Sequence, residues 1–320
     1  MRSMLMTRAA RTLVELSGVK PGENLLVLTD TEKFSIGQLV AGVGHEAGAK
    51  VTFMVQPAGK IHGEELSPVV AAAMKAADVV IAPVLKNIAH TSARLEATKA
   101  GTRVLIFPEV TEEMMLGGGI EADFVALRPT VDKLAQRIND AKVARLTNGA
   151  GTDITMSIEG RRGRSLNGFA NTVDIAAPPG LEASTAPVEG TAEGVVVVDG
   201  SIPGVGVVRG EPVRIEVKAG RAVSITGGPV AEAFRELLAG LNDPNVYLVG
   251  ELGIGMNPNC VIRGNMQDDE GMYGTAHVAF GTNKYIGGTN VAAGHYDVVI
   301  RKATLELDGE LVVKDGEVLV

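Results

Sequence analysis

Two residues near the C-terminus, His295 and Asp297, have the types and the spacing of a metal-binding pair. In a β-strand, residues i and i+2 point to the same face, so a His-x-Asp segment projects an imidazole and a carboxylate side by side. Both groups bind divalent cations when they are deprotonated. A His-x-Asp pair also occurs without a metal, so its meaning depends on the residues around it.

Two other segments place one polar side chain at the start of a strip of very small residues. Glu251, in GELGIGM (250–256), shares its strand face with two glycines, and His277 shares its face with Ala279 and Gly281. The opposite faces of both segments are apolar. Glycine weakens a strand, so it often marks the close approach of a ligand or another backbone. We therefore expect these strips to leave room for a metal ion and a substrate.

The first part of the chain alternates short apolar runs with helical patterns. Such alternation is typical of βαβ units with a parallel sheet. No glycine fingerprint follows the first predicted strand, which argues against a dinucleotide site. Strands are predicted at 25–29, 51–56, 78–83 and 103–107, and helices at 2–17, 35–46, 64–77, 91–100 and 131–143.

From about residue 152 the pattern changes to alternating segments separated by turns. Asp-Gly pairs at 199–200, 308–309 and 315–316 are strong turn signals between these segments. Strands are predicted at 152–158, 194–199, 213–217, 222–225, 246–250, 277–281, 295–300 and 303–307, with a single helix at 230–241. We therefore expect an α/β domain with a parallel sheet over residues 1–145. A mainly antiparallel β domain that carries the metal site should follow over residues 146–320.

Composition narrows the possible partners. The net charge of −8 argues against nucleic acid, which basic surfaces bind. No apolar run reaches the ~20 residues that a membrane helix needs. The single Cys260 excludes an internal disulfide and fits a reducing compartment. These features fit a cytoplasmic protein, and we expect it to act on a small substrate.

Four segments resemble the aminopeptidase T family of metallo-aminopeptidases, namely 178–194, 250–259, 268–288 and 294–300. The resemblance implies an α/β domain followed by a β-rich domain, assembly as a homodimer, and hydrolysis of N-terminal residues from short peptides. It implies two divalent ions, Zn, Co or Mn, whose ligands are Glu182, Glu251, His277, His295 and Asp297. Such a pair of cations can activate a water molecule for amide hydrolysis.

The same resemblance implies two catalytic residues. Glu270 aligns with a family carboxylate and could shuttle protons, although it could equally be an exposed residue of an acidic loop. The family's catalytic tyrosine aligns with Lys284, and Tyr285 stands one position further on. Tyr285 is therefore expected to take that role by a shift.

Charge favours two cations over one. Three carboxylates and two imidazoles carry more negative charge than one divalent ion balances. The alternative is a single Fe(II), as in the dihydroxypyridine dioxygenases, to which this superfamily is similar and in which a His occupies the position of Glu251. His277, His295 and Asp297 could supply its two-histidine, one-carboxylate triad. A third reading is a non-catalytic metal-binding homologue. Residues 159–164 are interpreted as either an anion-binding loop or a solvated charge run.

Overall fold

The computed structural model describes residues 2–171 and 174–320, which form two compact units. The first unit contains the residues up to Asp123 together with Gly168–Pro179. The second contains Phe124–Asn167 and Gly180–Val320. The division into folding domains at residues 145 and 146 stays a prediction.

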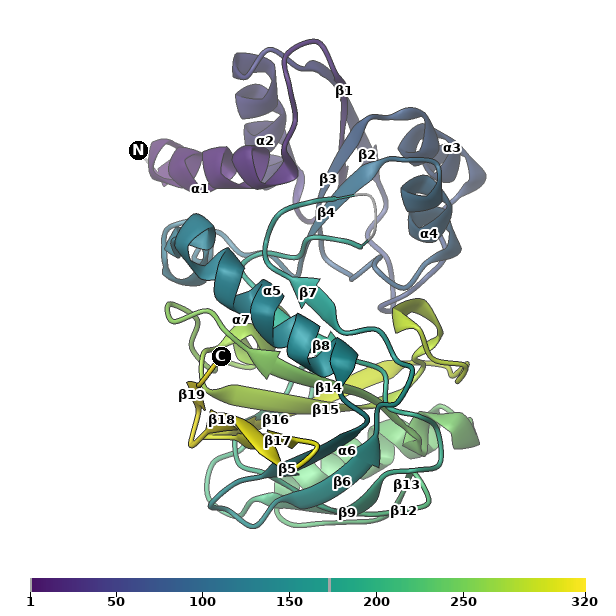
Figure 1. Ribbon diagram of the computed structural model, residues 1–320. Coiled ribbons are helices and arrows are strands. Elements are labelled where there is room, and N and C mark those ends of the chain that lie inside the picture. Colours follow the sequence, from purple (N-terminus) through teal and green to yellow (C-terminus); the bar gives the residue numbers. More distant parts are fainter. Residues whose placement is uncertain (1, 172–173) are drawn as a thin grey trace. The chain divides into compact units, whose positions relative to one another are not determined.

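The first unit is built on a four-stranded parallel sheet of order β2-β1-β3-β4, which confirms the predicted α/β class (Figure 1). Its central strands are buried along nearly their whole length, as expected for a parallel sheet covered on both faces. The strands are β1 (Asn24–Asp30), β2 (Lys50–Gln56), β3 (Val79–Val84) and β4 (Arg103–Pro108); the helices are α1 (Arg2–Ser17), α2 (Phe34–Glu46), α3 (Pro68–Ala76), α4 (Ser92–Lys99) and the 3-10 helix η1 (Gly118–Glu121).

Helix α3 begins later than the residue pattern predicted. Ser67 is its N-cap, and the Ser67 side chain accepts a hydrogen bond from the Val70 amide. Pro68 follows at the first helical position, where its missing N–H costs nothing. The helix therefore starts at this capped proline, although the apolar pattern starts at residue 64.

The second unit contains two antiparallel sheets, which confirms the predicted β-rich part of the chain. The seven-stranded sheet has the order β11-β10-β16-β15-β14-β8-β7, and the eight-stranded sheet has the order β13-β12-β9-β6-β5-β17-β18-β19. The strands are β5 (Val143–Thr147), β6 (Asp153–Ser157), β7 (Arg164–Leu166), β8 (Glu182–Thr185), β9 (Glu193–Val198), β10 (Ser201–Ile202), β11 (Gly206–Val207), β12 (Val213–Lys218), β13 (Arg221–Thr226), β14 (Val249–Gly255), β15 (Thr275–Gly281), β16 (His295–Arg301), β17 (Thr304–Leu307), β18 (Glu310–Lys314) and β19 (Glu317–Val318).

The helices of the second unit are more numerous than predicted. Helix α6 (Pro229–Gly240) matches the predicted one, and α5 (Phe124–Asp140) packs against β7 and β8 (Figure 1). The short helix α7 (Met266–Gly271) lies where an acidic loop was considered, and η2 (Pro244–Tyr247) and η3 (Lys284–Ile286) are 3-10 helices. In the described part of the chain, no helix is long and apolar enough to cross a membrane.

Both faces of β14 and β15 are buried. One face carries fully buried apolar side chains, among them Leu252, Val278 and Phe280. The opposite face carries the polar residues considered above. The sheet therefore holds these polar groups in the interior, where the charge of each has to be balanced by a neighbour.

Candidate metal centre

The register of the seven-stranded sheet places three candidate residues on one stretch of its buried face. Glu251 of β14 pairs with Ala279 of β15, and Ala279 pairs with Asp297 of β16. Paired residues of antiparallel strands share a face, so Glu251 and Asp297 flank the small Ala279 side chain. His295 lies on the same face of β16 as Asp297, two residues earlier in the sequence.

A neighbouring row holds the other imidazole. His277 of β15 pairs with Gly253 of β14, and Gly253 pairs on its other side with Ser184 of β8. Glu182, the first residue of β8, lies two residues from Ser184 and pairs with Gly255. Four adjacent strands thus bring together side chains that are up to 115 residues apart, the separation of Glu182 and Asp297 in the sequence.

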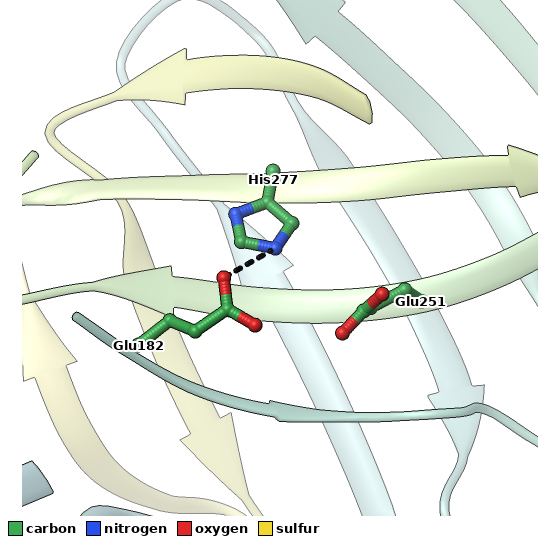
Figure 2. A group of neighbouring side chains, drawn as sticks. All are labelled: Glu182, Glu251 and His277. Carbon is green, nitrogen blue, oxygen red and sulfur yellow. Dashed lines mark ion pairs between the residues drawn. The ribbon is translucent and has the colours of Figure 1, made fainter. Parts of the chain in front are cut away.

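The polar side chains form two groups that share Glu251. In one group, Glu182, Glu251 and His277 offer ligand atoms within 4.8 Å of one another. Figure 2 shows the His277 ring and the two carboxylates directed toward the same space, with His277 Nε2 at 3.5 Å from Glu182 Oε2. The other group consists of Glu251, His295 and Asp297, whose ligand atoms also lie within 4.8 Å of one another. In it, His295 Nε2 lies 3.1 Å from Glu251 Oε2 and 3.5 Å from Asp297 Oδ1. The fold therefore assembles all the ligand candidates, while their binding of metal stays a proposal.

The two imidazoles fall into different groups. The triad of His277, His295 and Asp297, considered from the sequence for a single iron ion, is not among the ligand groups that the described residues form. The group that contains His295 instead combines one imidazole with two carboxylates.

Gly253 is required by the His277 ring. A Cβ atom at Gly253 would lie 2.1 Å from His277 Nε2, far inside van der Waals contact. At Gly255 a Cβ would lie 2.4 Å from the Glu270 carbonyl oxygen. The expectation of open room for a metal and a substrate is thus corrected, because the imidazole and the backbone of α7 fill the space over these glycines.

His295 is oriented by a backbone carbonyl. Its Nδ1 donates a 2.7 Å hydrogen bond to the oxygen of Thr282, which directs Nε2 toward the carboxylates. A hydrogen bond of this kind from the far ring nitrogen is typical of metal-ligating histidines. His277 differs, because its buried Nδ1 has no hydrogen-bond partner among the described residues.

Arg164 was not predicted to lie at this centre. It belongs to strand β7, where it is buried, and its Nη1 lies 3.0 Å from Glu251 Oε1. The same nitrogen donates to Ser184 Oγ at 3.2 Å, and Ser184 Oγ donates to Glu182 Oε1 at 3.1 Å. Both interpretations of residues 159–164 are therefore wrong for Arg164. The alternation of Arg164 and Leu166 on one strand face was the signal, hidden by the nearby arginines.

The charges in this interior shift the pKa values in opposite directions. Burial raises the pKa of Glu182. Burial acts on Glu251 as well, but its hydrogen bond with His295 and the charge of Arg164 hold its pKa at about 2. Burial lowers the pKa of His295, whereas the carboxylates of Asp297 and Glu251 outweigh this and raise it well above the ordinary value. Glu251 is therefore ionised, whereas Glu182 holds a proton more readily than Glu251 does.

Glu270 reaches this centre from helix α7. Burial and the nearby charges of Asp297 and Glu182 raise the pKa of Glu270 well above its ordinary value, and its carboxyl is hydrogen-bonded to Asp297. A neutral Glu270 therefore donates to the Asp297 carboxylate. Asp269, fully buried, fixes the helix by accepting from the Arg263 and Gly264 amides. An exposed acidic loop is thus the wrong picture of this segment, while the catalytic role of Glu270 stays a prediction.

Tyr285 lies on η3, in the connection between β15 and β16. It is half-buried, and the Lys284 ammonium lies 5.9 Å from the centre of its ring. This connection begins at Thr282, which orients His295, so Tyr285 belongs to a segment attached to the centre. Its catalytic role stays a prediction.

Comparison with known proteins identifies relatives along almost the whole chain. Residues 5–320 match the family described as NicX: 2,5-dihydroxypyridine 5,6-dioxygenase. The 2,5-dihydroxypyridine 5,6-dioxygenase of Pseudomonas putida KT2440 is 27% identical over 262 residues, which cover 77% of this chain and 72% of that protein.

Two solved structures share the fold. The 2,5-dihydroxypyridine dioxygenase of P. putida KT2440 has a TM-score of 0.85 at 23% identity, covering 98% of this chain and 97% of that one. Wild-type AmpT from Thermus thermophilus has a TM-score of 0.69 at 18% identity, covering 98% and 99%. At these identities the two likenesses describe the fold alone.

The expected membership of the aminopeptidase T family is wrong, and so is the expected metallo-aminopeptidase activity. The match over residues 5–320 is to a dioxygenase family rather than to a hydrolase or protease. The error has a structural reason, because AmpT and the dioxygenase share this fold over nearly the whole chain. Motifs that follow the shared strands therefore do not separate the two families.

Proposed function

Because this chain belongs to the NicX family of 2,5-dihydroxypyridine 5,6-dioxygenases, we propose that it is a ring-cleaving dioxygenase of a dihydroxylated pyridine. Such a reaction breaks one bond of the ring and places both atoms of O2 in the product. The observation that carries the proposal is the family match over residues 5–320. The buried ligand group of Glu251, His295 and Asp297 supports it.

We assign a single Fe(II) to that group, in place of the two Zn, Co or Mn ions expected from the sequence. Carboxylate oxygens and an imidazole nitrogen are suitable ligands for a first-row divalent ion. His295 Nε2 is available as a ligand because Nδ1 donates to Thr282. When bound, a ferrous ion supplies the one-electron chemistry that lets O2 react with an aromatic ring.

Glu182 and His277 are suited to take a proton from a hydroxyl group of the substrate. Ser184 donates to Glu182 Oε1, which leaves Oε2 facing His277 Nε2 at 3.5 Å. Burial raises the pKa of Glu182, which makes its carboxylate a better proton acceptor than an exposed glutamate. We propose that Glu182 Oε2 accepts the hydroxyl proton of the bound dihydroxypyridine and that His277 Nε2 stabilises the resulting acid.

Glu270 is assigned a supporting part. As a neutral acid it donates to Asp297, which fixes the orientation of that carboxylate. Its position in α7 also closes one side of the buried face beside Gly255. The homodimer and the cytoplasmic location stay predictions.

The protein is first loaded with Fe(II) under anaerobic conditions. Its oxygen consumption is then measured in aerated buffer. With 2,5-dihydroxypyridine or one of its positional isomers, we expect one O2 to be consumed for each ring whose ultraviolet absorbance disappears. Leucine-p-nitroanilide should not be cleaved by the same preparation. Absence of oxygen uptake with all dihydroxypyridine isomers, in protein shown to contain iron, would refute the proposal.

A further inference from the structure

We propose that the ion pair of Arg164 and Glu251 takes the place of the second imidazole in a two-histidine, one-carboxylate iron site, and that Arg164 thereby limits the centre to one divalent cation. The inference rests on the metal site proposed above. It does not depend on the reaction with oxygen.

The first support is the way Glu251 divides its two oxygens. Oε2 faces His295 at 3.1 Å, whereas Oε1 faces Arg164 at 3.0 Å. Glu251 belongs to both ligand groups, so it would have to bridge two cations if both groups were occupied. Arg164 already holds Oε1 with a permanent positive charge, which leaves Oε2 for a cation beside His295 and Asp297.

The second support is the charge of the ligand group. A triad of two neutral imidazoles and one carboxylate carries one negative charge. Glu251, His295 and Asp297 carry two negative charges when His295 is neutral, and the guanidinium of Arg164 removes one of them. With its partner, Glu251 is thus electrically equivalent to an imidazole ligand.

The net charge of all the carboxylates in the centre also indicates one divalent cation. Glu182, Glu251 and Asp297 provide three carboxylates, and Arg164 provides one guanidinium at their edge. Two negative charges remain, which one divalent cation balances. The sequence-based charge count that favoured two metals did not include this buried arginine.

Arg164 and Glu251 form a buried ion pair, not a solvent-exposed one. Its side chain is 5% exposed and that of Glu251 is 6% exposed. Removal of one member of such a buried pair leaves an uncompensated charge, which is strongly unfavourable. Ser184 extends the contact, because it accepts from Arg164 and donates to Glu182. Arg164 is therefore a positioning residue for both carboxylates.

The test is the number of Mn(II) ions that the full chain retains after equilibrium dialysis, measured by elemental analysis. We expect one per chain in the unmodified protein and two per chain in Arg164→Met, because the lost charge is replaced by a second cation. Arg164→Lys should retain one. Arg162→Met is the matched control, since it removes an exposed arginine two residues away, and it should also retain one.

A double variant tests the equivalence to an imidazole. Arg164→Met combined with Glu251→His rebuilds a two-histidine, one-carboxylate group and should return the count to one. A count of one in folded Arg164→Met, or of two in the unmodified protein, would overturn the inference. A count of two in the unmodified protein would overturn the inference even if Arg164→Met does not fold. One ion per chain without oxygen uptake would refute only the dioxygenase proposal.

Discussion

Thr282 and His295 are joined by a 2.7 Å hydrogen bond from the ring Nδ1 to the carbonyl oxygen. Thr282 directly follows β15 and His295 begins β16, so the bond closes the connection between the two strands. It fixes the ring so that Nε2 points at Glu251 and Asp297. Metal binding at Nε2 must release the proton that the carboxylates favour there.

His295→Ala is expected to reduce bound iron to less than a tenth of that in the unmodified protein. The variant removes the only imidazole of its ligand group, and lost ligands weaken metal sites by large factors. Iron content after anaerobic reconstitution measures the effect, and circular dichroism checks the fold. His45→Ala, at an exposed position of α2, is the control and should keep its iron. Undiminished iron in His295→Ala would mean that this imidazole is not a ligand.

Gly253→Ala is expected to destabilise the protein by about 1–3 kcal/mol, the usual cost of overpacking. The added methyl would lie 2.1 Å from His277 Nε2, so the ring has to move away from Glu182. Gly42→Ala is the matched control, because a Cβ in this helix meets nothing within 4 Å. It should stabilise the protein by up to about 1 kcal/mol. Denaturant unfolding measures both, and equal stabilities would refute the close contact.

Much of the fold could be predicted from the residue pattern, because the signals are local. Apolar runs alternating with helices indicated the parallel sheet of the first unit. The Asp-Gly pairs at 308–309 and 315–316 marked two hairpins of the second, whereas the pair at 199–200 connects strands of different sheets. At Asp308 and Gly309 both residues have positive φ angles, as a two-residue hairpin turn requires. These features depend on neighbours in the sequence, so they can be read before the fold is known.

The centre was predicted only in part, because its missing members depend on long-range pairing. Arg164 meets Glu251 across 87 positions of sequence, and nothing near Arg164 indicates that partner. The helical form of residues 266–271 depends on capping by Asn265 and on the buried Asp269. The hydrolase expectation was corrected by the family match over residues 5–320, because the strands that carry these motifs occur in both AmpT and the dioxygenase.

Glu189, which lies between β8 and β9, contacts the connection between β15 and β16. We expect its contribution to the stability of the folded protein to depend on pH. It accepts hydrogen bonds from the Thr289 amide at 2.7 Å and from Asn283 Nδ2 at 2.9 Å, and it pairs with Arg161. Partial burial raises its pKa, but these contacts outweigh that and lower it to about 2. The carboxylate is thus stabilised in the folded state.

Since the folded pKa lies below the ordinary value of 4.5, this stabilisation is complete above about pH 4.5 and is lost as the pH falls toward 2. Glu189→Gln should therefore lower the free energy of unfolding by about 1 kcal/mol at pH 7 and by less at pH 3. Glu236→Gln, on the exposed face of α6, should change little at either pH. A deficit that grows on acidification would contradict the assigned direction.

Asp297→Asn should abolish the stabilisation of the protein by divalent metal. A cation that binds only the folded state stabilises it by about 2.7 kcal/mol at a concentration 100 times its Kd. Asp297 supplies one of the two carboxylates of its ligand group, and the amide of Asn carries no charge and is a weaker ligand. The melting temperature of the unmodified protein should therefore rise by several degrees when Mn(II) replaces a chelator, and that of Asp297→Asn should not.

Asp315→Asn is the control, because it makes the same chemical change in an exposed turn. Asn also tolerates the positive φ of 49° there, so this variant should respond to Mn(II) as the unmodified protein does. If Asp297→Asn were stabilised by Mn(II) to the same extent, the cation would lie elsewhere, and the group of Glu182, Glu251 and His277 would become the site to test.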